Sequence, residues 1–294
     1  MTQNTINSKS QDDREEKFSI RNLIFPFSVA LVVLFSLAPI LWQFLTSVKT
    51  NDAIVALPNV YFPSPNQLTL SHYTELFERR PFFSYMLNSA FVSLTSTILC
   101  LTLGSPAAYA LARLRIKGEN VILAIVLVIT LFPYILLFLG LLELVKATGL
   151  GNNFLALIIP YTAINLPLTI LVMRSFFQQL PRDLEDSARV DGYNTVQMLQ
   201  KIVLPMTLPA LATTGILTFI FAWNEFIFAL TFITLEDLKT IPVAAAQIGG
   251  SSVFEIPYGT IAAATVLGTF PLVVLVLFFQ KKIVQGLTAG AVKG

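Results

Sequence analysis

Residues 180–205 read LPRDLEDSARVDGYNTVQMLQKIVLP, a polar segment between long apolar runs. Four of the chain's 17 acidic residues lie in this segment, within nine consecutive positions: Asp183, Glu185, Asp186 and Asp191. Lipid cannot solvate these charges, so the segment must lie in water or against a partner protein. Residues 181–205 are called the polar loop below.

The polar loop is predicted to form two short helices around a glycine. Pro181 suits a first helical position, where its missing N–H has no cost. The acidic residues that follow Pro181 lie where the helix dipole favours negative charge. Gly192 supplies the left-handed conformation that often ends a helix. A structured, charged loop between membrane spans is typical of a docking element.

The composition identifies an integral membrane protein. Hydrophobic residues make up 55% of the 294 residues and charged ones 12%, against about 25% charged in soluble domains. A helix needs about 20 apolar residues to cross the hydrocarbon core, and backbone groups in lipid must be satisfied within helices. We therefore expect an all-α polytopic fold with six transmembrane helices, at residues 23–45, 85–111, 121–144, 154–177, 208–233 and 259–279.

The basic residues predict the orientation. With the N-terminus in the cytoplasm, 14 of the 19 Lys and Arg residues lie in inner segments and five in outer ones, as the positive-inside rule requires. The net charge of +2 thus reflects topology and does not indicate nucleic-acid binding. The predicted organisation is a cytoplasmic tail (1–22), a first span with an ordered outer loop (23–84), one unit formed by the other five spans (85–280) and a cytoplasmic tail (281–294).

The spacing within the polar loop carries a family resemblance. Asp186-Ser187-Ala188 is followed by three residues, Gly192, nine residues, and then Ile202-x-Leu204-Pro205. This resembles the EAA-x3-G-x9-I-x-LP loop of permease subunits from binding-protein-dependent ABC importers. In that family the loop is the coupling helix, which sits in a cleft of the cytoplasmic ATPase. The departures are Asp186 in place of Glu and Ser187 in place of Ala.

Two further stretches resemble carbohydrate permeases. Phe221-Ala222-Trp223-Asn224-Glu225-Phe226 is similar to the W-N-E-F segment of their fifth span, and residues 286–294, GLTAGAVKG, resemble the tail of the maltose- and trehalose-type second permease. The resemblance implies a second permease subunit, two ATPase subunits that bind ATP and Mg, an extracytoplasmic solute-binding protein, and a location in the bacterial plasma membrane. Disaccharide-sized glycosides fit it best.

The candidate coupling residues follow from the matched spacing. Glu185 and Asp186 are alternative docking carboxylates, and the small Ser187 and Ala188 would let a partner approach. Val196, Leu199, Ile202 and Val203 recur at helical spacing and are predicted to anchor the second helix to the bundle. The full candidate set is Glu185, Asp186, Ser187, Ala188, Asp191, Gly192, Ile202, Leu204 and Pro205.

Trp223, Asn224 and Glu225 are candidates for the solute path. Acidic residues inside spans are functional candidates, but Glu225 could equally reach interfacial water or pair with Asn224 and a neighbouring helix. Trp223 could stack on a sugar, although tryptophan is commonly an interfacial anchor. The polar residues in or near spans could line a path or form helix–helix hydrogen bonds: Asn88, Tyr134, Tyr161 and Asn165.

The sequence offers no catalytic constellation. It contains no G-x4-G-K-[ST] phosphate loop, no G-x-S-x-G elbow and no H-E-x-x-H pair. The single histidine, His72, and the single cysteine, Cys100, do not suggest a metal site. We therefore expect a non-enzymatic subunit without a cofactor of its own. An ion-coupled carrier or channel and a membrane scaffold remain alternative interpretations.

Overall fold

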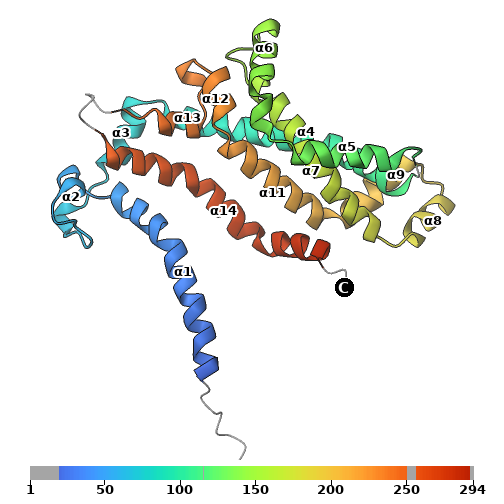
Figure 1. The fold of residues 1–294 in the computed structure, drawn as a ribbon, viewed down its shortest axis with the longest axis horizontal. Coiled ribbons are helices and arrows are strands. Elements are labelled where there is room, and N and C mark those ends of the chain that lie inside the picture. Colours follow the sequence, from blue (N-terminus) through green and yellow to red (C-terminus); the bar gives the residue numbers. More distant parts are fainter. Residues whose placement is uncertain (1–19, 115, 250–255, 292–294) are drawn as a thin grey trace, which may run out of the picture.

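The computed structural model describes residues 20–114, 116–249 and 256–291, and within these residues the chain forms helices and turns without a strand. This confirms the predicted all-α polytopic fold. The centre of the molecule is a layer of long helices lying side by side: α4 (Phe82–Arg113), α7 (Leu155–Gln179), α11 (Leu208–Asn224) and α14 (Tyr258–Ala291) (Figure 1).

Helices α4 and α7 pack closely because small residues lie where they cross. A Cβ atom built on Gly104 would lie 2.6 Å from Cγ2 of Thr169. Such approach of two backbones is typical of helix pairs in membranes, where packing replaces the hydrophobic driving force.

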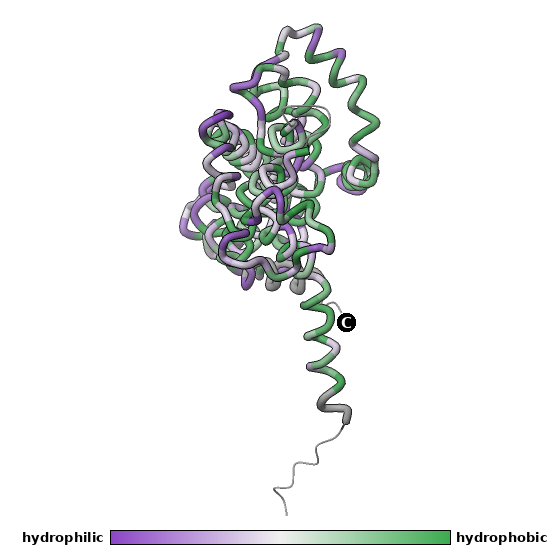
Figure 2. The backbone as a smooth tube through the Cα atoms, turned by 90° about the vertical axis from the view of Figure 1, so that its left-hand side faces the viewer, coloured by the Kyte–Doolittle hydropathy of each residue, from purple (hydrophilic) through white to green (hydrophobic). Residues whose placement is uncertain are grey.

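Helix α1 (Ile20–Ser47) stands apart from this layer. Its main helix contact is α14, and every side chain from Ile24 to Trp42 is exposed. Figure 2 shows α1 leaving the body of the molecule as a hydrophobic segment. The span is therefore an addition at the front of the chain, with a surface suited to lipid or to another subunit.

Two of the predicted spans are broken helices, which corrects the expectation of six continuous ones. In the described residues four helices are long and apolar enough to cross a membrane, and two bent pairs raise the number to as many as six. The third span bends by 89° between α5 (Glu119–Leu131) and the segment formed by η2 (Tyr134–Leu137) and α6 (Phe138–Thr148). Pro133 explains this break, because the residue before a proline favours an extended backbone, and Phe132 has φ −73° and ψ 131°.

The fifth span is also discontinuous. A bend of 81° separates α11 from Thr195–Met206, the second half of the polar loop, so this bend lies just before the predicted span. At its other end α11 stops at Asn224, Glu225 is extended with ψ 130°, and a separate short helix follows, α12 (Ile227–Phe232). The expected single helix over 208–233 therefore consists of α11 and α12.

The outer loop forms an ordered cap of short segments, as predicted: α2 (Asn51–Val55), η1 (Pro65–Gln67) and α3 (Ser71–Arg79). His72 is buried in this cap, with Nε2 2.8 Å from the carbonyl oxygen of Lys49. Lys49 is itself buried; its ammonium donates to the Val60 carbonyl and lies 4.4 Å from the Trp42 ring centroid. Burial lowers the pKa of Lys49.

Gly259 allows α14 to pack against the cap, and Gly259→Ala should destabilise the chain. The added Cβ would lie 2.2 Å from His72 Nε2, and overpacking of this kind costs about 1–3 kcal/mol. We expect a lower apparent Tm in detergent. The control is Gly140→Ala in α6, where a Cβ meets nothing within 4 Å. Equal Tm values for the two variants would contradict the packing argument.

Candidate functional site

The first half of the polar loop is helix α8 (Asp183–Val190). The helix begins two residues after Pro181, so Pro181 precedes it and is not the first helical residue as predicted. The predicted glycine end is confirmed. Gly192 has φ +83°, Tyr193 N donates to Ala188 O, and Gly192 N donates to Arg189 O. These two bonds form the Schellman motif, in which a left-handed glycine satisfies the last helical carbonyls.

The second half of the polar loop starts at a capping box and continues as a helix that contains a π-helical turn. Asn194 caps α9 (Thr195–Met198) through reciprocal bonds with Gln197. A π-helical turn, η3 (Leu199–Val203), and α10 (Leu204–Met206) follow. Leu199 and Val203 are buried and Ile202 packs against the same cluster, as predicted. Val196 is 62% exposed, so its predicted anchoring role is wrong, and Met198 is the buried residue instead. The residues that pack on this cluster, Met198, Leu199, Ile202 and Val203, lie three or four positions apart on one face of the helix, and Val196 lies off that face.

The two candidate carboxylates point in different directions. Glu185 is 6% exposed and faces the bundle, where its Oε1 lies 3.1 Å from Nε of Arg113. Asp186 is exposed and lies 3.3 Å from Arg189 Nη1 on the same helix. That pair is largely solvated, and exposed i,i+3 pairs contribute little. Asp186 is thus the carboxylate that a partner can reach.

Arg113 holds three elements together at the end of the bundle on which α8 packs. Its Nη2 donates to the carbonyl oxygens of Phe177 and Leu180, both at 2.5 Å. Its Nε faces Glu185, so the end of α4, the end of α7 and helix α8 share one guanidinium group. In the sequence, Arg113 is only one of the 14 basic residues of the inner segments. An arginine in the last turn of a long apolar helix, with an acidic loop two spans later, was the available clue.

The other motif residues divide between the two faces of the polar loop. Ala188 is 2% exposed and packs in the cluster with Phe177 and Met198, so its small size lets α8 approach its own bundle rather than a partner. The half-buried side chains that pack on the same cluster are Ile202 and Leu204. The exposed members are Asp186, Ser187, Asp191, Gly192 and Pro205.

The predicted path residues occupy the break between α11 and α12. Glu225 is 5% exposed: its carboxylate accepts a bond from the Tyr161 hydroxyl (2.5 Å) and bonds from the backbone N–H groups of Phe228 (2.9 Å) and Ala229 (3.2 Å). The predicted pairing of Glu225 with a neighbouring helix is therefore present, through Tyr161 of α7. The predicted pairing with Asn224 is not, because the Asn224 amide bonds to the Ile220 carbonyl oxygen instead. A carboxylate at this place also satisfies the free N–H groups at the start of α12.

Trp223 and Asn224 differ in accessibility. Trp223 is 4% exposed, and its Nε1 donates to the carbonyl oxygen of Gly268. It is therefore packed inside the chain and does not present its ring to lipid as an anchor. Asn224 is exposed, although its Nδ2 donates to the carbonyl oxygen of Ile220.

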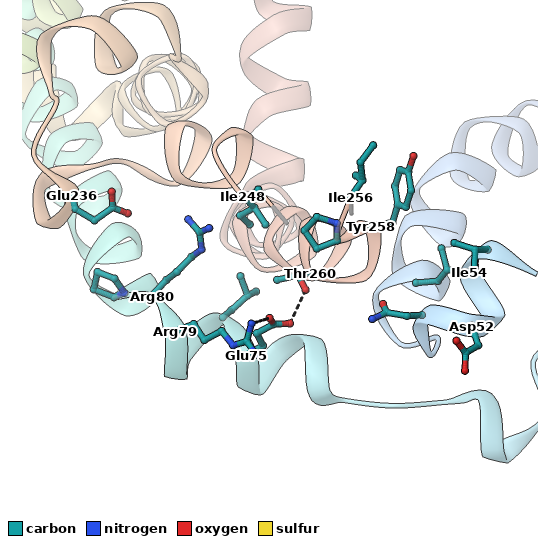
Figure 3. Close-up of a pocket in the computed structure, with 16 residues that line it drawn as sticks. Asp52, Ile54, Glu75, Arg79, Arg80, Glu236, Ile248, Ile256, Tyr258 and Thr260 are labelled. Carbon is teal, nitrogen blue, oxygen red and sulfur yellow. Dashed lines mark hydrogen bonds and ion pairs between the residues drawn. The ribbon is translucent and has the colours of Figure 1, made fainter. Parts of the chain in front are cut away.

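A charged recess of about 640 Å³ lies at the opposite end of the molecule, between the cap and the start of α14. Figure 3 shows Glu75 bound to Arg79 (2.8 Å) and to the Thr260 hydroxyl (3.0 Å). Glu236, in η4 (Glu236–Leu238), also lines the recess. Hydrogen bonds from Lys239 and from the Tyr85 hydroxyl lower the pKa of Glu236, so this carboxylate stays charged.

Comparison with known proteins decides the family. Residues 100–289, more than half of the chain and including the whole polar loop, match the binding-protein-dependent transport system inner membrane component family. The chain belongs to this family. It is accordingly a multi-pass inner-membrane permease subunit of an ATP-driven, binding-protein-dependent importer, and it is not catalytic.

Curated relatives of this permease extend over nearly its full length. The trehalose transport system permease protein SugB of Mycobacterium tuberculosis is 40% identical over 90% of this chain and 95% of the relative. The sulfoquinovosyl glycerol transport system permease protein SmoH of Agrobacterium fabrum is 38% identical, covering 94% and 95%. The trehalose/maltose transport system permease protein MalG of Thermococcus litoralis is 37% identical, covering 94% and 98%.

A solved structure supports the permease fold. A chain of a bacterial ABC transporter involved in the import of the acidic polysaccharide alginate aligns with a TM-score of 0.76 at 24% identity, covering 89% of this chain and 96% of the other.

Proposed function

We propose that this permease imports a disaccharide or a similar glycoside. The support comes from the relatives, whose names specify trehalose, trehalose/maltose and sulfoquinovosyl glycerol. These solutes share a glycosidic linkage and several hydroxyl groups. Identity of 37–40% over at least 90% of the chain makes this solute class the expected one.

The proposed complex contains this chain, a second permease that is a different chain, and two cytoplasmic ATPase subunits that bind ATP and Mg. It lies in a bacterial plasma membrane with both termini of this chain in the cytoplasm. A solute-binding protein delivers the glycoside to the outer face, where the charged recess beside α3 and α14 lies. Closure of the ATPases draws the polar loops together and shifts the spans between inward- and outward-open states.

The exposed edge of α8 is the proposed contact with the ATPase. The observation that carries this assignment is that two adjacent carboxylates have different environments. Glu185 is paired with Arg113 inside the chain, and Asp186 is exposed. Val190, at the end of the same helix, is 88% exposed. An accessible charge beside an exposed apolar side chain is suited to a protein interface.

Asp186→Arg should uncouple transport without unfolding the chain. Reversal of a charge that is paired across an interface costs about 2–5 kcal/mol of docking energy. Uptake by the reconstituted complex should therefore fall at least about 30-fold, and co-purification of the ATPase should weaken. The matched control is Glu143→Arg in α6, a 78% exposed carboxylate side chain outside the polar loop, which should retain uptake.

Two outcomes would contradict the proposal. Normal ATPase binding and uptake by Asp186→Arg would show that α8 does not dock through this residue. Uptake by the complex lacking its ATPase would contradict coupling through the polar loop.

A further inference from the structure

The two broken spans meet at one place in the fold. Tyr134 lies just after the break in the third span. Its ring centroid is 5.4 Å from that of Phe221 in α11 and 6.1 Å from that of Phe228 in α12. Tyr161 of α7 lies 6.3 Å from Phe221 and binds Glu225. The break after α5 and the break after α11 therefore share one cluster of aromatic side chains.

This cluster lies well inside the membrane. The 13 residues of α5 rise about 20 Å from its inner end at ~1.5 Å per residue. Asn165 lies ten residues after Leu155, the first residue of α7, or about 15 Å from the outer end of that helix. In a hydrocarbon core of about 30 Å, both estimates place the cluster between the midplane and the outer third.

Non-helical backbone at this depth, such as that at the Phe132–Pro133 break, needs cover other than lipid. Phe132, at the break, is 48% exposed, and Leu136, in the next turn, is 65% exposed. Irregular backbone is tolerated in the hydrocarbon region only where protein buries it or where it lines a water-filled cavity. Discontinuous helices near the midplane also form the solute sites of many secondary transporters.

A pocket of about 500 Å³ opens at the break. Its walls are mostly apolar, with the aromatic side chains of Phe132, Tyr134 and Phe221. Two polar groups lack a hydrogen-bond partner within the described residues: the Tyr134 hydroxyl and Oδ1 of Asn165, whose Nδ2 donates to the Tyr161 carbonyl. Small-ligand sites combine this volume, aromatic walls and a few polar groups.

We propose that this pocket is a glycoside subsite on this chain's side of the solute path. Tyr134 and Phe221 offer flat faces to the C–H side of a sugar ring, while the Tyr134 hydroxyl and the Asn165 amide oxygen bind sugar hydroxyls. The solute class rests on the proposed function. The subsite itself rests on the two breaks, the pocket and the unpaired polar groups.

Transport kinetics test the subsite. The complete complex is reconstituted with its binding protein, and uptake is measured with radiolabelled trehalose, maltose, sulfoquinovosyl glycerol and diacetylchitobiose as probes. Asn165→Leu and Tyr134→Phe remove polar groups with little change in volume. We expect each to raise the KM for the imported probe about five- to tenfold, as for the loss of one hydrogen bond. The ATPase rate stimulated by the binding protein should persist.

Tyr61→Phe, a hydroxyl deletion at a 62% exposed residue of the outer cap, is the matched control and should leave the KM unchanged. Unchanged KM values for both pocket variants would overturn the subsite. A wild-type complex that imports none of the probes would instead contradict the proposed function, and the subsite would fall with it.

Cysteine labelling identifies the occupant. Ala163 lines the pocket and is exposed, whereas the natural Cys100 is fully buried and does not compete. A water-soluble maleimide should label Ala163→Cys, and loaded binding protein should protect it more than unloaded binding protein does. Leu235→Cys, at a 55% exposed site, should be labelled equally in both conditions.

Two labelling patterns would overturn the proposal. Labelling of Ala163→Cys only by a lipid-soluble maleimide would show an acyl chain in the pocket. Labelling in the isolated chain but never in the complex, with or without solute, would show that the second permease fills it.

Discussion

Glu185→Ala should destabilise this permease by about 3–5 kcal/mol, the range for breaking a buried ion pair by removing one partner. The Arg113 and Glu185 side chains are 5% and 8% exposed, so the remaining guanidinium charge would be largely without water. Arg113 would still donate to the Phe177 and Leu180 carbonyls, but α8 would lose its ionic contact with α4. We expect a strongly lowered apparent Tm and loss of uptake.

A double variant tests whether the loss of stability comes from the unpaired charge of Arg113 or from the loss of side-chain volume. Arg113→Met/Glu185→Met removes both charges, and apolar replacement of a whole buried pair is often tolerated. It should therefore be more stable than Glu185→Ala, although the Phe177 and Leu180 carbonyls lose their donor. Asp186→Ala is the control on the adjacent residue and should leave the Tm unchanged. If the double variant is less stable than Glu185→Ala, the pair does not stabilise the loop as described.

Variants of Glu185 and Asp186 would separate the stability of the polar loop from its docking to the ATPase, which the sequence could not do. In the sequence, Glu185 and Asp186 are alternative docking carboxylates with the same expected role. The structure assigns different consequences to the two residues, because the orientation of α8 depends on Arg113, 72 positions earlier in the chain. Spacing within the loop predicted the glycine end and the helix pair, which depend on neighbouring residues. It could not predict which carboxylate turns inward.

The breaks in the spans likewise could not be predicted from local sequence. Hydropathy located every apolar stretch, because lipid imposes a length and a composition on each. Pro133 was one of several prolines within or near the spans, and the others inside α1, α4, α7 and α14 leave those helices continuous. Where a proline interrupts a helix depends on whether neighbours satisfy the freed backbone groups. The packing of Tyr134 against Phe221 and Phe228 is such a tertiary condition.

Glu225→Ala should be the most damaging change in the outer half of the bundle. The variant would leave the Tyr161 hydroxyl and the N–H groups of Phe228 and Ala229 without their acceptor in a buried site. Each unsatisfied buried group costs about 1–3 kcal/mol, so the summed loss is a large part of the stability of a typical protein. Both the Tm and uptake should fall.

Glu225→Gln distinguishes the capping role from a direct contact with solute. The amide keeps one acceptor oxygen but presents an NH₂ group where the second carboxylate oxygen accepted a bond. We therefore expect a Tm between those of the wild type and Glu225→Ala. Uptake should likewise lie between the values of these two proteins. Asn224→Ala, at the adjacent exposed residue, should retain the wild-type Tm. If Glu225→Gln instead keeps the wild-type Tm and alters only the KM for the imported glycoside, then Glu225 contacts solute during the cycle. In that case the bond to Tyr161 must open as the spans move, and the break between α11 and α12 is a moving part of the path rather than a fixed support for it.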